Sequence, residues 1–384
     1  MTEHIQPSYA GLRVVDFTRV LAGPFATMIL ADLGAEVIKV EAERGDDSRH
    51  LPPKWGQEST AFLAVNRNKK SVVLDLKTAA GSAAALKLCQ TADVVIESFR
   101  PGTMERLGLG FDAVAAGNNR VVYCSISAFG AGRLGRDMPG YDALLQAFSG
   151  ILKSTGHPGE APVRIGPSAI DLTTGMWAAI QIMAALARRD RISAPQRLDA
   201  VLIDASLNLM CHQLIGTLAT GVAPQPQGSG APSTAPYEIF RASDGELMIA
   251  AGNDRLFAIL CAEIGRPELA TLPNYRTMSD RVANRRALHD AIESRLREDS
   301  VGQWLRRLAA AGVPAGAVQD LKQAAEHPLV AERNLIYPSP TDDAPDLRLL
   351  RLPLGDLACH RLPPPKLGEH TEEVLRDMGI DDPG

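Results

Sequence analysis

The sequence has little cysteine and no arrangement of side chains typical of a metal site. Its five cysteines are scattered through 384 residues, and no two stand in a C-x-x-C pattern. An odd number of isolated cysteines argues against a disulfide framework and favours buried thiols in a reducing compartment. The histidines near the C-terminus, His327, His360 and His370, lack metal-ligand spacing as well. We therefore predict a cytoplasmic protein without a bound metal ion.

Signals for nucleic-acid binding, secretion and membrane insertion are also missing. Asp and Glu outnumber Lys and Arg by 45 to 40, and no dense basic run offsets the net charge of −5, so a nucleic-acid partner is not expected. Residues 1–10 lack the basic region and apolar stretch of a signal peptide. The longest apolar helix candidate, 176–187, contains Gln181 and is too short for a bilayer. The hydrophobic content of 45% is that of an ordinary globular protein.

The first half of the chain alternates between apolar strand patterns and helix patterns. Helical stretches, such as 23–33 and 79–91, lie between short β-branched runs at 12–17, 36–41, 71–76, 92–97 and 120–126. Buried strands that alternate with helices predict βαβ units. The expected fold is therefore α/β, with a parallel sheet covered by helices on both faces.

The rest of the chain predicts a second, smaller α+β region. Two long helices, at 172–189 and 199–218, precede a stretch rich in Gly, Pro, Ser and Gln at 221–236, which is typical of a linker. The runs 237–241 and 246–251 flank the turn Ser243-Asp244-Gly245 and predict a hairpin. Further helices are expected at 254–264, 279–298 and 301–311, with a short final one after 366–371.

The turn after the first strand has features of a phosphate-binding site. Residues 16–24 end in Ala22-Gly23-Pro24, which places small residues and a proline at the first turn of a helix, beside the carboxyl end of a strand. α/β proteins receive phosphates and nucleotides at such positions. The glycine fingerprint of dinucleotide-binding proteins and the P-loop pattern are both missing. An ordinary βα turn therefore remains an alternative.

Asp171 is the residue for which we predict a chemical role. It follows the loop 164–170 and precedes the apolar helix. One interpretation is a helix N-cap, in which the carboxylate accepts backbone N–H groups. The other is a carboxylate nucleophile that those N–H groups and the helix dipole hold ionised. The two are compatible, because a capping carboxylate is also an oriented one.

Several short motifs occur in a fixed order along the chain. They are Ala22-Gly23-Pro24-Phe25-Ala26, Asn66-Arg67-Asn68-Lys69-Lys70-Ser71, Gly140-Tyr141-Asp142, Pro236-Tyr237, Asp244-Gly245 and Leu367-Gly368-Glu369-His370-Thr371. This ordered set resembles the class III CoA-transferases, the family of formyl-CoA and carnitine CoA-transferases, and the resemblance runs from Leu12 to Ile380. It implies a Rossmann-like large domain at 1–220, a linker at 221–236, a small α+β domain at 237–325 and a segment at 326–384 that returns to the large domain. It also implies an interlocked homodimer.

The resemblance implies where CoA binds. The residues expected to contact it are Arg19, Val20, Leu21, Ala22, Leu74, Lys77, Ser98, Phe99, Arg100, Arg106 and Tyr141. Because CoA carries a pyrophosphate and a 3′-phosphate, its site needs cations or backbone N–H groups. Arg67, Lys69 and Lys70 are further candidates, with solvated surface charge as the alternative. Ala42 stands where some members have an arginine, and Arg44 is a candidate substitute.

Tyr141 distinguishes two chemistries within the superfamily that the sequence resembles. Its α-methylacyl-CoA racemases have a histidine here, paired with the acid that corresponds to Asp171. A tyrosine, with an ordinary pKa of about 10, is a poor base near pH 7, whereas a histidine near about 6.5 is suitable. Tyr141 with Asp171 therefore favours CoA transfer, and His157 is a less favoured base.

The implied reaction transfers CoA from an acyl-CoA to a free carboxylic acid, through an anhydride and a thioester on Asp171, without a tightly bound cofactor. The segments 20–28, 66–71 and 251–254 resemble the succinyl-CoA:glutarate type, which implies succinyl-CoA as donor and a short dicarboxylate as acceptor. Arg164 is a candidate ligand of the acceptor, and 228–232 is either a lid or a plain linker. A racemase or epimerase, a nicotinamide enzyme and a non-catalytic CoA-binding protein remain alternatives.

Overall fold

The computed structural model describes residues 7–380, which form two compact units. Within the described residues, the first consists of 7–150, 165–212 and 331–380, and the second of Ile151–Arg164 and Gln213–Val330. Of the ten residues considered for a signal peptide, 1–6 lie outside the described residues.

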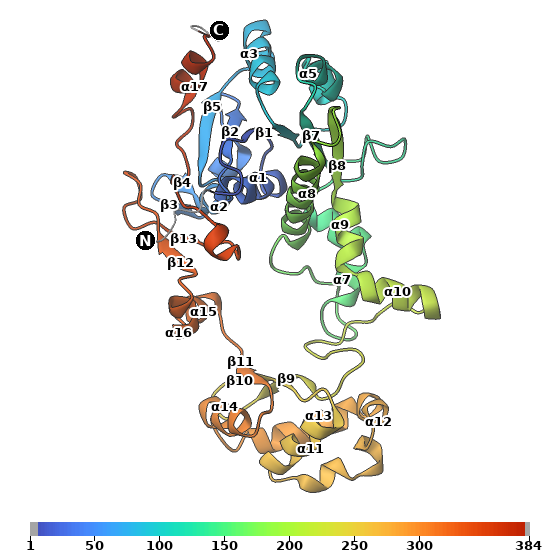
Figure 1. The fold of residues 1–384 in the computed structure, drawn as a ribbon. Helices are drawn as coiled ribbons and strands as arrows, with labels where there is room; N and C mark the ends of the chain where they lie inside the picture. The colour runs from blue at the N-terminus through green and yellow to red at the C-terminus, as the bar shows by residue number, and fades with distance from the viewer. Residues whose placement is uncertain (1–6, 381–384) are drawn as a thin grey trace. The chain divides into compact units, whose positions relative to one another are not determined.

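Six parallel strands form the sheet of the first unit, in the order β5-β2-β1-β6-β7-β8 (Figure 1). They are β1 (Arg13–Phe17), β2 (Glu36–Glu41), β5 (Lys69–Val73), β6 (Val94–Glu97), β7 (Val122–Ser127) and β8 (Gln196–Val201). The central strand β1 pairs Val14 with Val37 on one side and with Val94 on the other. Buried β-branched residues of this kind favour a parallel sheet with both faces covered. The predicted α/β fold with a parallel sheet is confirmed.

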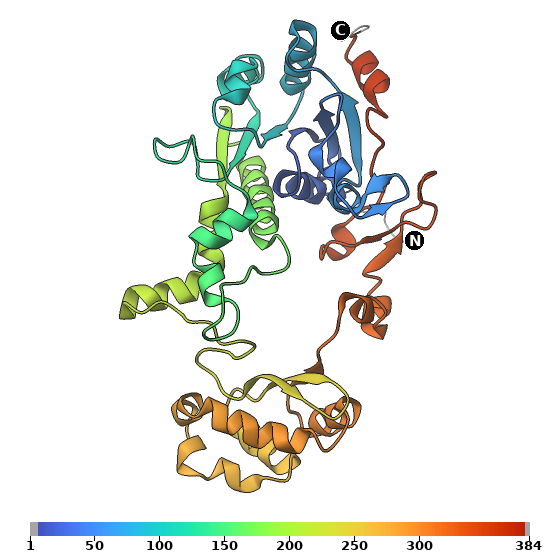
Figure 2. The same cartoon turned by 180° about the vertical axis from the view of Figure 1, so that it is seen from behind.

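Helices lie on both faces of this sheet (Figures 1 and 2). On one face, α3 (Ala79–Gln90), α5 (Phe111–Gly117) and α17 (Thr371–Asp377) pack on the strands through a shared apolar core. On the other lie α1 (Ala22–Asp32) and α8 (Ala169–Arg188), which cross closely. A Cβ at Gly175 of α8 would lie 2.5 Å from the Ala22 carbonyl oxygen, so only glycine permits this crossing. The close approach places the start of α8 beside the turn after β1.

The helix predicted for 199–218 is wrong in its first part. Residues Gln196–Val201 form the edge strand β8, which is followed by α9 (Leu202–Leu209) and α10 (Cys211–Thr220). Arg197 and Asp199 are exposed, whereas Gln196 and Ala200 are buried. This alternation has the period of two of a strand with one solvated face. Two charges in such a short strand resemble a polar helical turn.

α8 is longer than predicted, because it begins at Ala169, before Asp171. Its length of 20 residues and mean hydropathy of 1.3 make it, within residues 7–380, the one helix that could cross a membrane by length and composition alone. The prediction that this apolar segment is too short for a bilayer is therefore wrong. In the structure α8 packs along α1, β7, β8 and α9, in the position of a helix that covers the sheet.

The C-terminal segment joins the first unit at the edge strand β5. His370 donates its backbone N–H to the Ser71 carbonyl (2.9 Å), and the Thr371 hydroxyl accepts the Val73 N–H (3.1 Å). Val73 and Thr371 are 298 positions apart in the sequence. The edge of the sheet is therefore covered by a segment from the other end of the chain.

The second unit is a small α+β assembly. Its antiparallel strands, β9 (Tyr237–Arg241), β10 (Glu246–Ala250) and β11 (Ala315–Ala317), lie in the order β11-β10-β9, so the predicted hairpin is confirmed. The helix predicted for 279–298 is divided at Asn284 into α12 (Met278–Ala283) and α13 (Arg285–Leu296); α11 (Asp254–Glu263) and α14 (Val301–Ala310) complete the core. Residues 151–164 and 213–236, which the sequence assigned to the large domain and the linker, lie in this unit.

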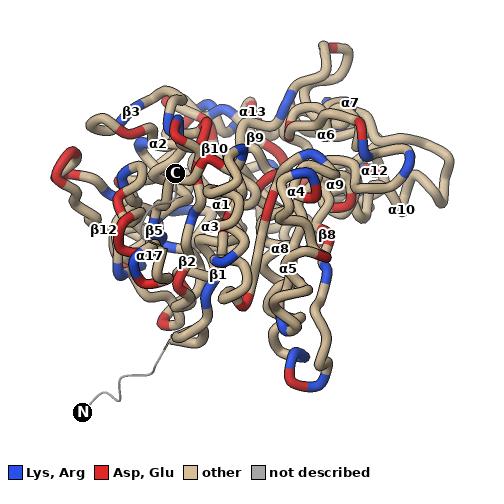
Figure 3. Tube along the Cα trace, turned by 90° about the horizontal axis from the view of Figure 1, so that it is seen from above, with Lys and Arg blue, Asp and Glu red and all other residues tan. Residues whose placement is uncertain are grey.

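The remaining strands and α-helices are short. They are β3 (Lys54–Trp55), β4 (Glu58–Ser59), α2 (Thr60–Val65), α4 (Thr103–Arg106), α6 (Asp142–Phe148), α7 (Ile151–Ser154), α15 (Leu321–Ala325), α16 (Pro328–Glu332), β12 (Ile336–Pro338) and β13 (Arg348–Leu350). Figure 3 shows basic and acidic residues interspersed along the trace. A site for an anionic ligand therefore depends on where individual cations lie.

Candidate active site

A cavity of about 230 Å³ lies in the first unit where β1, β6 and β7 end. Ligands of open α/β sheets bind at the carboxyl ends of the strands. The cavity wall contains most of the residues predicted to contact CoA, together with the predicted nucleophile: Arg19, Val20, Leu21, Ala22, Ser98, Phe99, Arg100, Tyr141 and Asp171. Asp47, Met138 and Leu202, which the sequence did not single out, also line it. The structure thus brings together the turn after β1, the loop after β6 and the first turn of α8.

Three predicted CoA contacts do not line this cavity: Leu74, Lys77 and Arg106. Leu74 is buried in the apolar core that α3 and α5 share with the sheet. Lys77 and Arg106 are exposed, and the Arg106 guanidinium donates to the Thr103 hydroxyl (2.9 Å). Contacts of Lys77 and Arg106 with CoA stay predictions, whereas the Leu74 side chain is not accessible to it.

The cations at 67–70 are engaged within the protein. Arg67 is buried and forms an ion pair with Asp32 (2.6 Å). Lys69 is buried against Asp16 (3.2 Å), and Lys70 bridges two acidic side chains. The suggestion that these three bind the phosphates of CoA is therefore wrong for Arg67 and Lys69. Sequence reasoning takes a charge to be solvated, but each of these two is buried with an acid from a distant part of the chain.

Asp171 is the third residue of α8, and it does not cap this helix. Ser168 occupies the N-cap position without a side-chain hydrogen bond. Asp142 in α6 takes the free N–H groups instead: its Oδ2 accepts from Ile170 (2.9 Å) and from Asp171 itself (3.4 Å). The N-cap interpretation of Asp171 is therefore wrong. Sequence reasoning missed Asp142 as the cap because it lies 29 positions earlier, on another helix.

The Asp171 carboxyl has no hydrogen bond or ion pair with any residue of 7–380. Burial raises its pKa from 3.8 to about 7, and the nearby carboxylate of Asp142 adds to this shift. The prediction that backbone N–H groups hold Asp171 ionised is thus wrong, because Asp142 takes those groups. At neutral pH the Asp171 carboxyl is divided between its acid and carboxylate forms. Such a perturbed acid in a cavity is typical of an active site.

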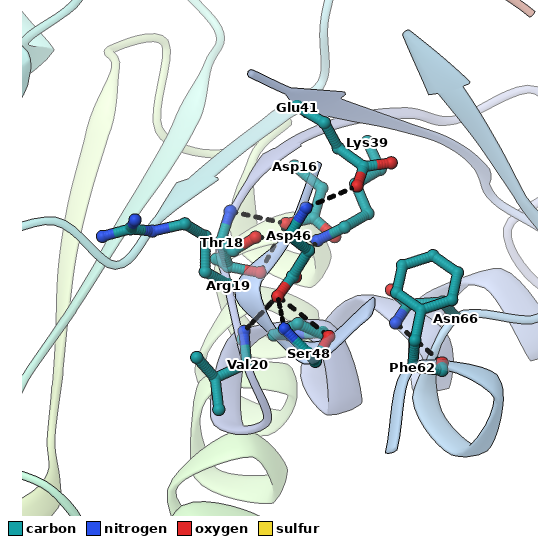
Figure 4. A network of polar contacts seen from close by, with 12 residues as sticks. Asp16, Thr18, Arg19, Val20, Lys39, Glu41, Asp46, Ser48, Phe62 and Asn66 are labelled. Carbon is teal, nitrogen blue, oxygen red and sulfur yellow. Dashed lines mark hydrogen bonds and ion pairs between the residues drawn. The ribbon is translucent and has the colours of Figure 1, made fainter. Parts of the chain in front are cut away.

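A buried charge network holds the turn after β1 (Figure 4). Val20 has a φ of 68°, a left-handed conformation that is rare for a β-branched residue, and its N–H donates to Asp46 (3.1 Å). Asp46 forms a 2.8 Å ion pair with Lys39 of β2, whose Nζ also donates to the Thr18 carbonyl (2.8 Å). Burial opposes the charge of Asp46, but Lys39 and the hydrogen bonds outweigh it and lower the pKa to about 2. This network fixes the backbone of one cavity wall.

The loop after β6 is attached to the same turn. The Arg19 N–H donates to the Ser98 hydroxyl (3.1 Å), and the Arg19 guanidinium lies over the Phe99 ring, 5.1 Å from its centroid. Arg100 follows in this loop and also lines the cavity. Arg19 and Arg100 are therefore the basic side chains of the cavity wall, and guanidinium groups suit phosphates and carboxylates.

The other candidates lie apart from this cavity or in the second unit. Arg44 is exposed and is not in the cavity wall. Arg164 and His157 belong to the second unit. So does the segment 228–232, where Ser229 accepts a backbone N–H of β9 (3.0 Å) and Arg285 donates to the Ala231 carbonyl. The roles of these residues as acceptor ligand, base and lid stay predictions.

Comparison with known proteins identifies the family. Residues 9–371 match the model of CoA-transferase family III. The chain therefore belongs to CoA-transferase family III and is a CoA-transferase, as the resemblance of its motifs implied.

Its similarity to individual members extends over nearly the whole chain. It is 41% identical to the acetyl-CoA:oxalate CoA-transferase of Acetobacter aceti, over 86% of each chain. It is 36% identical to the succinyl-CoA:glutarate CoA-transferase of Mus musculus, over 96% of this chain and 86% of that one. The solved structure of a CAIB/BAIF family protein from Brucella suis matches it with a TM-score of 0.88 and 35% identity, over 97% of this chain and 100% of that one.

Proposed function

We propose that this protein transfers CoA from succinyl-CoA to a short dicarboxylic acid and that Asp171 carries the acyl group and then the CoA. One observation carries the proposal: among residues 7–380, Asp171 is an acid without a cationic partner, in a cavity wall formed by the residues expected at a CoA site. The choice of substrates is supported by similarity to relatives that use oxalate or glutarate as the acid. We also propose that the reaction takes place in the cytoplasm and uses no metal ion or further cofactor.

Four substitutions at carbonyl carbons complete the reaction. The Asp171 carboxylate attacks the carbonyl carbon of the donor thioester and displaces the CoA thiolate. A mixed anhydride forms on Asp171. The thiolate then attacks the Asp171 carbonyl carbon and expels the donor acid, which leaves an aspartyl-CoA thioester. The acceptor carboxylate attacks this thioester and releases the thiolate, which finally attacks the acceptor carbonyl and frees Asp171. One thioester replaces another, so the sequence of steps needs no outside source of energy.

The surroundings of Asp171 suit it as a nucleophile. A carboxylate with a pKa of about 7 is more basic, and hence a better nucleophile, than an ordinary aspartate, yet a substantial fraction is ionised at neutral pH. The Asp142 carboxylate keeps the backbone at the start of α8 in place. The acid is therefore oriented without being neutralised by a cation.

The cavity accommodates only the reacting end of the substrate. Its volume of about 230 Å³ is below the roughly 300–1,000 Å³ of typical ligand pockets. We propose that this cavity holds the thioester and the adjacent part of the pantetheine arm, and that Arg19 and Arg100 meet anionic groups of CoA or of the acceptor.

We further propose that the protein acts as an interlocked homodimer. α10 has no buried residue, and its Ile215 and Leu218 are 65% and 73% exposed. Large apolar side chains of α6 and α8, among them Phe148 and Ile180, are also exposed. Exposed apolar patches of this kind mark interaction surfaces. Mixing differently tagged dimers tests the interlocked form: subunits should exchange only under conditions that unfold the protein.

Chemical trapping tests the role of Asp171. Protein incubated with succinyl-CoA and then with hydroxylamine or borohydride should yield a modified peptide that contains Asp171, and Asp171→Ala should yield none. An unmodified peptide from protein that binds CoA would contradict the proposal. In that case, exchange of deuterium into the α-carbon of a 2-methylacyl-CoA would identify a racemase, and its absence a CoA-binding protein. Initial rates with oxalate, glutarate and mesaconate then rank the acceptors.

A further inference from the structure

A second cavity, of about 380 Å³, adjoins the first within the same unit. The two cavities share part of their walls, namely Phe99, Arg100, Pro101, Ile126 and Ser127. The loop after β6 therefore separates them. Whatever holds this loop from the side of the second cavity also holds one wall of the candidate active site.

Glu97, the last residue of β6, is such a group. It lines the second cavity, yet only 7% of its surface is exposed. In the sheet it lies beside Ser125 of β7, which lies beside Asp199 of β8, and all three line this cavity. Because adjacent residues of parallel strands project to the same face, they form a polar row across the sheet. A buried acid in such a row needs a reason to be there.

The contacts of Glu97 point to the loop. Its Oε2 accepts the N–H of Phe99 (2.8 Å), and the Ser125 hydroxyl also bonds to the carboxylate. A side chain that accepts the N–H two residues later closes a tight turn of the backbone. Phe99 in turn lies under the Arg19 guanidinium, and its neighbour Ser98 accepts the Arg19 N–H. Contacts thus run without a gap from Glu97 through the loop to the turn after β1.

We propose that Glu97 is a positioning residue for the acyl-CoA site, which holds the loop Ser98–Pro101 against the turn after β1 through the Phe99 N–H. This inference rests on the proposed function, because it places the acyl-CoA against that loop. Glu97 acts through Phe99 and Arg19 and does not itself reach the reacting atoms. A carboxylate binds an N–H more strongly than a carboxylic acid does, so protonation of Glu97 loosens the loop and weakens CoA binding.

The surroundings place the ionisation of Glu97 near neutral pH. Burial raises its pKa from 4.5 to about 7; the Ser125 hydroxyl and the Phe99 N–H oppose this rise, Glu105 of α4 adds to it and Arg197 of β8 opposes it. The other charged groups around the same cavity are Arg100, Arg136 and Asp199, and two further titratable side chains of β7, Tyr123 and Cys124, interact with Glu97. The affinity for CoA should therefore fall as the pH decreases through about 7.

Calorimetric titration with CoA between pH 6 and 8.5 tests the proposal. The parent protein for this test is Asp171→Asn, in which the reactive acid cannot titrate. Glu97→Gln keeps the size of the side chain and an acceptor oxygen but cannot ionise. The 3′-phosphate of CoA also titrates, at about pH 6. The quantity compared at each pH is therefore a ratio: the Kd for CoA of the parent carrying Glu97→Gln, divided by the Kd of the parent itself. This ratio should be about 5 at pH 8.5 and about 1 at pH 6.

Asp112→Asn is the matched control, because Asp112 is an exposed acid of α5 that lines neither cavity. Its ratio should stay near 1 at every pH. A Glu97→Gln ratio that stays near 1 at pH 8.5, or that is the same at all pH values, overturns the positioning role. Thermal melting confirms that each variant is folded. If the parent binds no CoA at any pH, the proposed function fails together with this inference. If the parent binds CoA but the ratio stays near 1, only this inference fails.

Discussion

Asp46 and Asp171 are both largely withdrawn from solvent, but they lie in opposite electrostatic surroundings. Asp46 faces the Lys39 ammonium at 2.8 Å and accepts backbone N–H groups, and its pKa is lowered to about 2. Asp171 faces another carboxylate, that of Asp142, and its pKa is raised to about 7. Burial disfavours the charge in both cases, so the partner decides the outcome. Two acids of one unit thus differ in pKa through their neighbours alone.

The two surroundings serve different ends. The paired acid holds the backbone of the turn after β1, including Val20 in its left-handed conformation. The unpaired acid, Asp171, lies in the wall of the same cavity and has a pKa close to neutral pH. Ionic pairing therefore stabilises the wall, and the lack of pairing maintains a reactive group, so substitutions in the two regions should affect different properties.

The largest effect is expected from Asp171→Asn in the unpaired region. An amide cannot attack the thioester or carry the anhydride, so transfer should fall by roughly 10⁴-fold or more. The measurement is the initial rate with succinyl-CoA and glutarate, followed by chromatography of the CoA esters. Asp47→Asn, an exposed acid of the same cavity wall, should retain activity within about tenfold. Equal losses in both variants would contradict the assignment of Asp171.

In the paired region, Lys39→Met should act on stability. It leaves the Asp46 charge buried without its cation, which typically costs about 3–5 kcal/mol in the free energy of unfolding. Urea denaturation at pH 7 measures this loss. Lys70→Met is the control, because Lys70 is more exposed in its pair with Glu373 and should cost less than about 1 kcal/mol. Similar losses at both lysines would mean that burial of the pair makes no difference.

Asp171→Asn should also stabilise the protein, in a way that depends on pH. Since the native pKa of about 7 lies above the ordinary 3.8, the wild-type protein loses stability as pH rises through this range. The variant should be more stable by about 1–4 kcal/mol above pH 7, and the gain should vanish below about pH 4. Denaturation in urea at pH 4, 6 and 8 tests this. A gain that does not depend on pH would show that the charge of Asp171 is not its source.

The smallest effect is expected at Val20, where the paired network holds the backbone. Asparagine tolerates the left-handed region better than a β-branched residue does, so Val20→Asn should raise stability by about 1 kcal/mol. Thermal unfolding detects such a change. Val222→Asn, at another exposed valine, should change stability by less than about 0.5 kcal/mol. If Val20→Asn is destabilising, the contacts of the valine side chain outweigh the backbone conformation.

Sequence reasoning predicts the elements with strong local patterns and misses those that depend on distant partners. The strand Glu36–Glu41 is found at its predicted limits, because its apolar residues and the flanking helix patterns are local signals. β8 is missed because Arg197 and Asp199 hide a short period-two pattern. Most of the predicted CoA contacts line one cavity because they follow strand ends, and parallel strands end at one edge of the sheet.

Electrostatic roles are the part that the sequence could not provide. Arg67 and Lys69 lie among charged neighbours in the sequence, so nothing local indicates that both are buried. Asp142 stands beside Tyr141 in a recognisable motif, but its role as the cap of α8 depends on the packing of α6 against α8. Glu97 is the last residue of an apolar strand. Its hydrogen bond with the Phe99 N–H and its place in the second cavity are seen only in the structure.

The attachment of the C-terminal segment to β5 has a consequence for the nascent chain. While the ribosome is still making the second unit, β5 has no cover along its outer edge, because Thr371 lies 298 positions after its partner Val73. An uncovered edge strand is a site for pairing with other chains. Domains usually fold from the N-terminus during synthesis. The first unit of this protein cannot complete its fold until α17 has left the exit tunnel. Premature termination between residues 202 and 370 should therefore yield an aggregating product, even though every strand of the parallel sheet is already present.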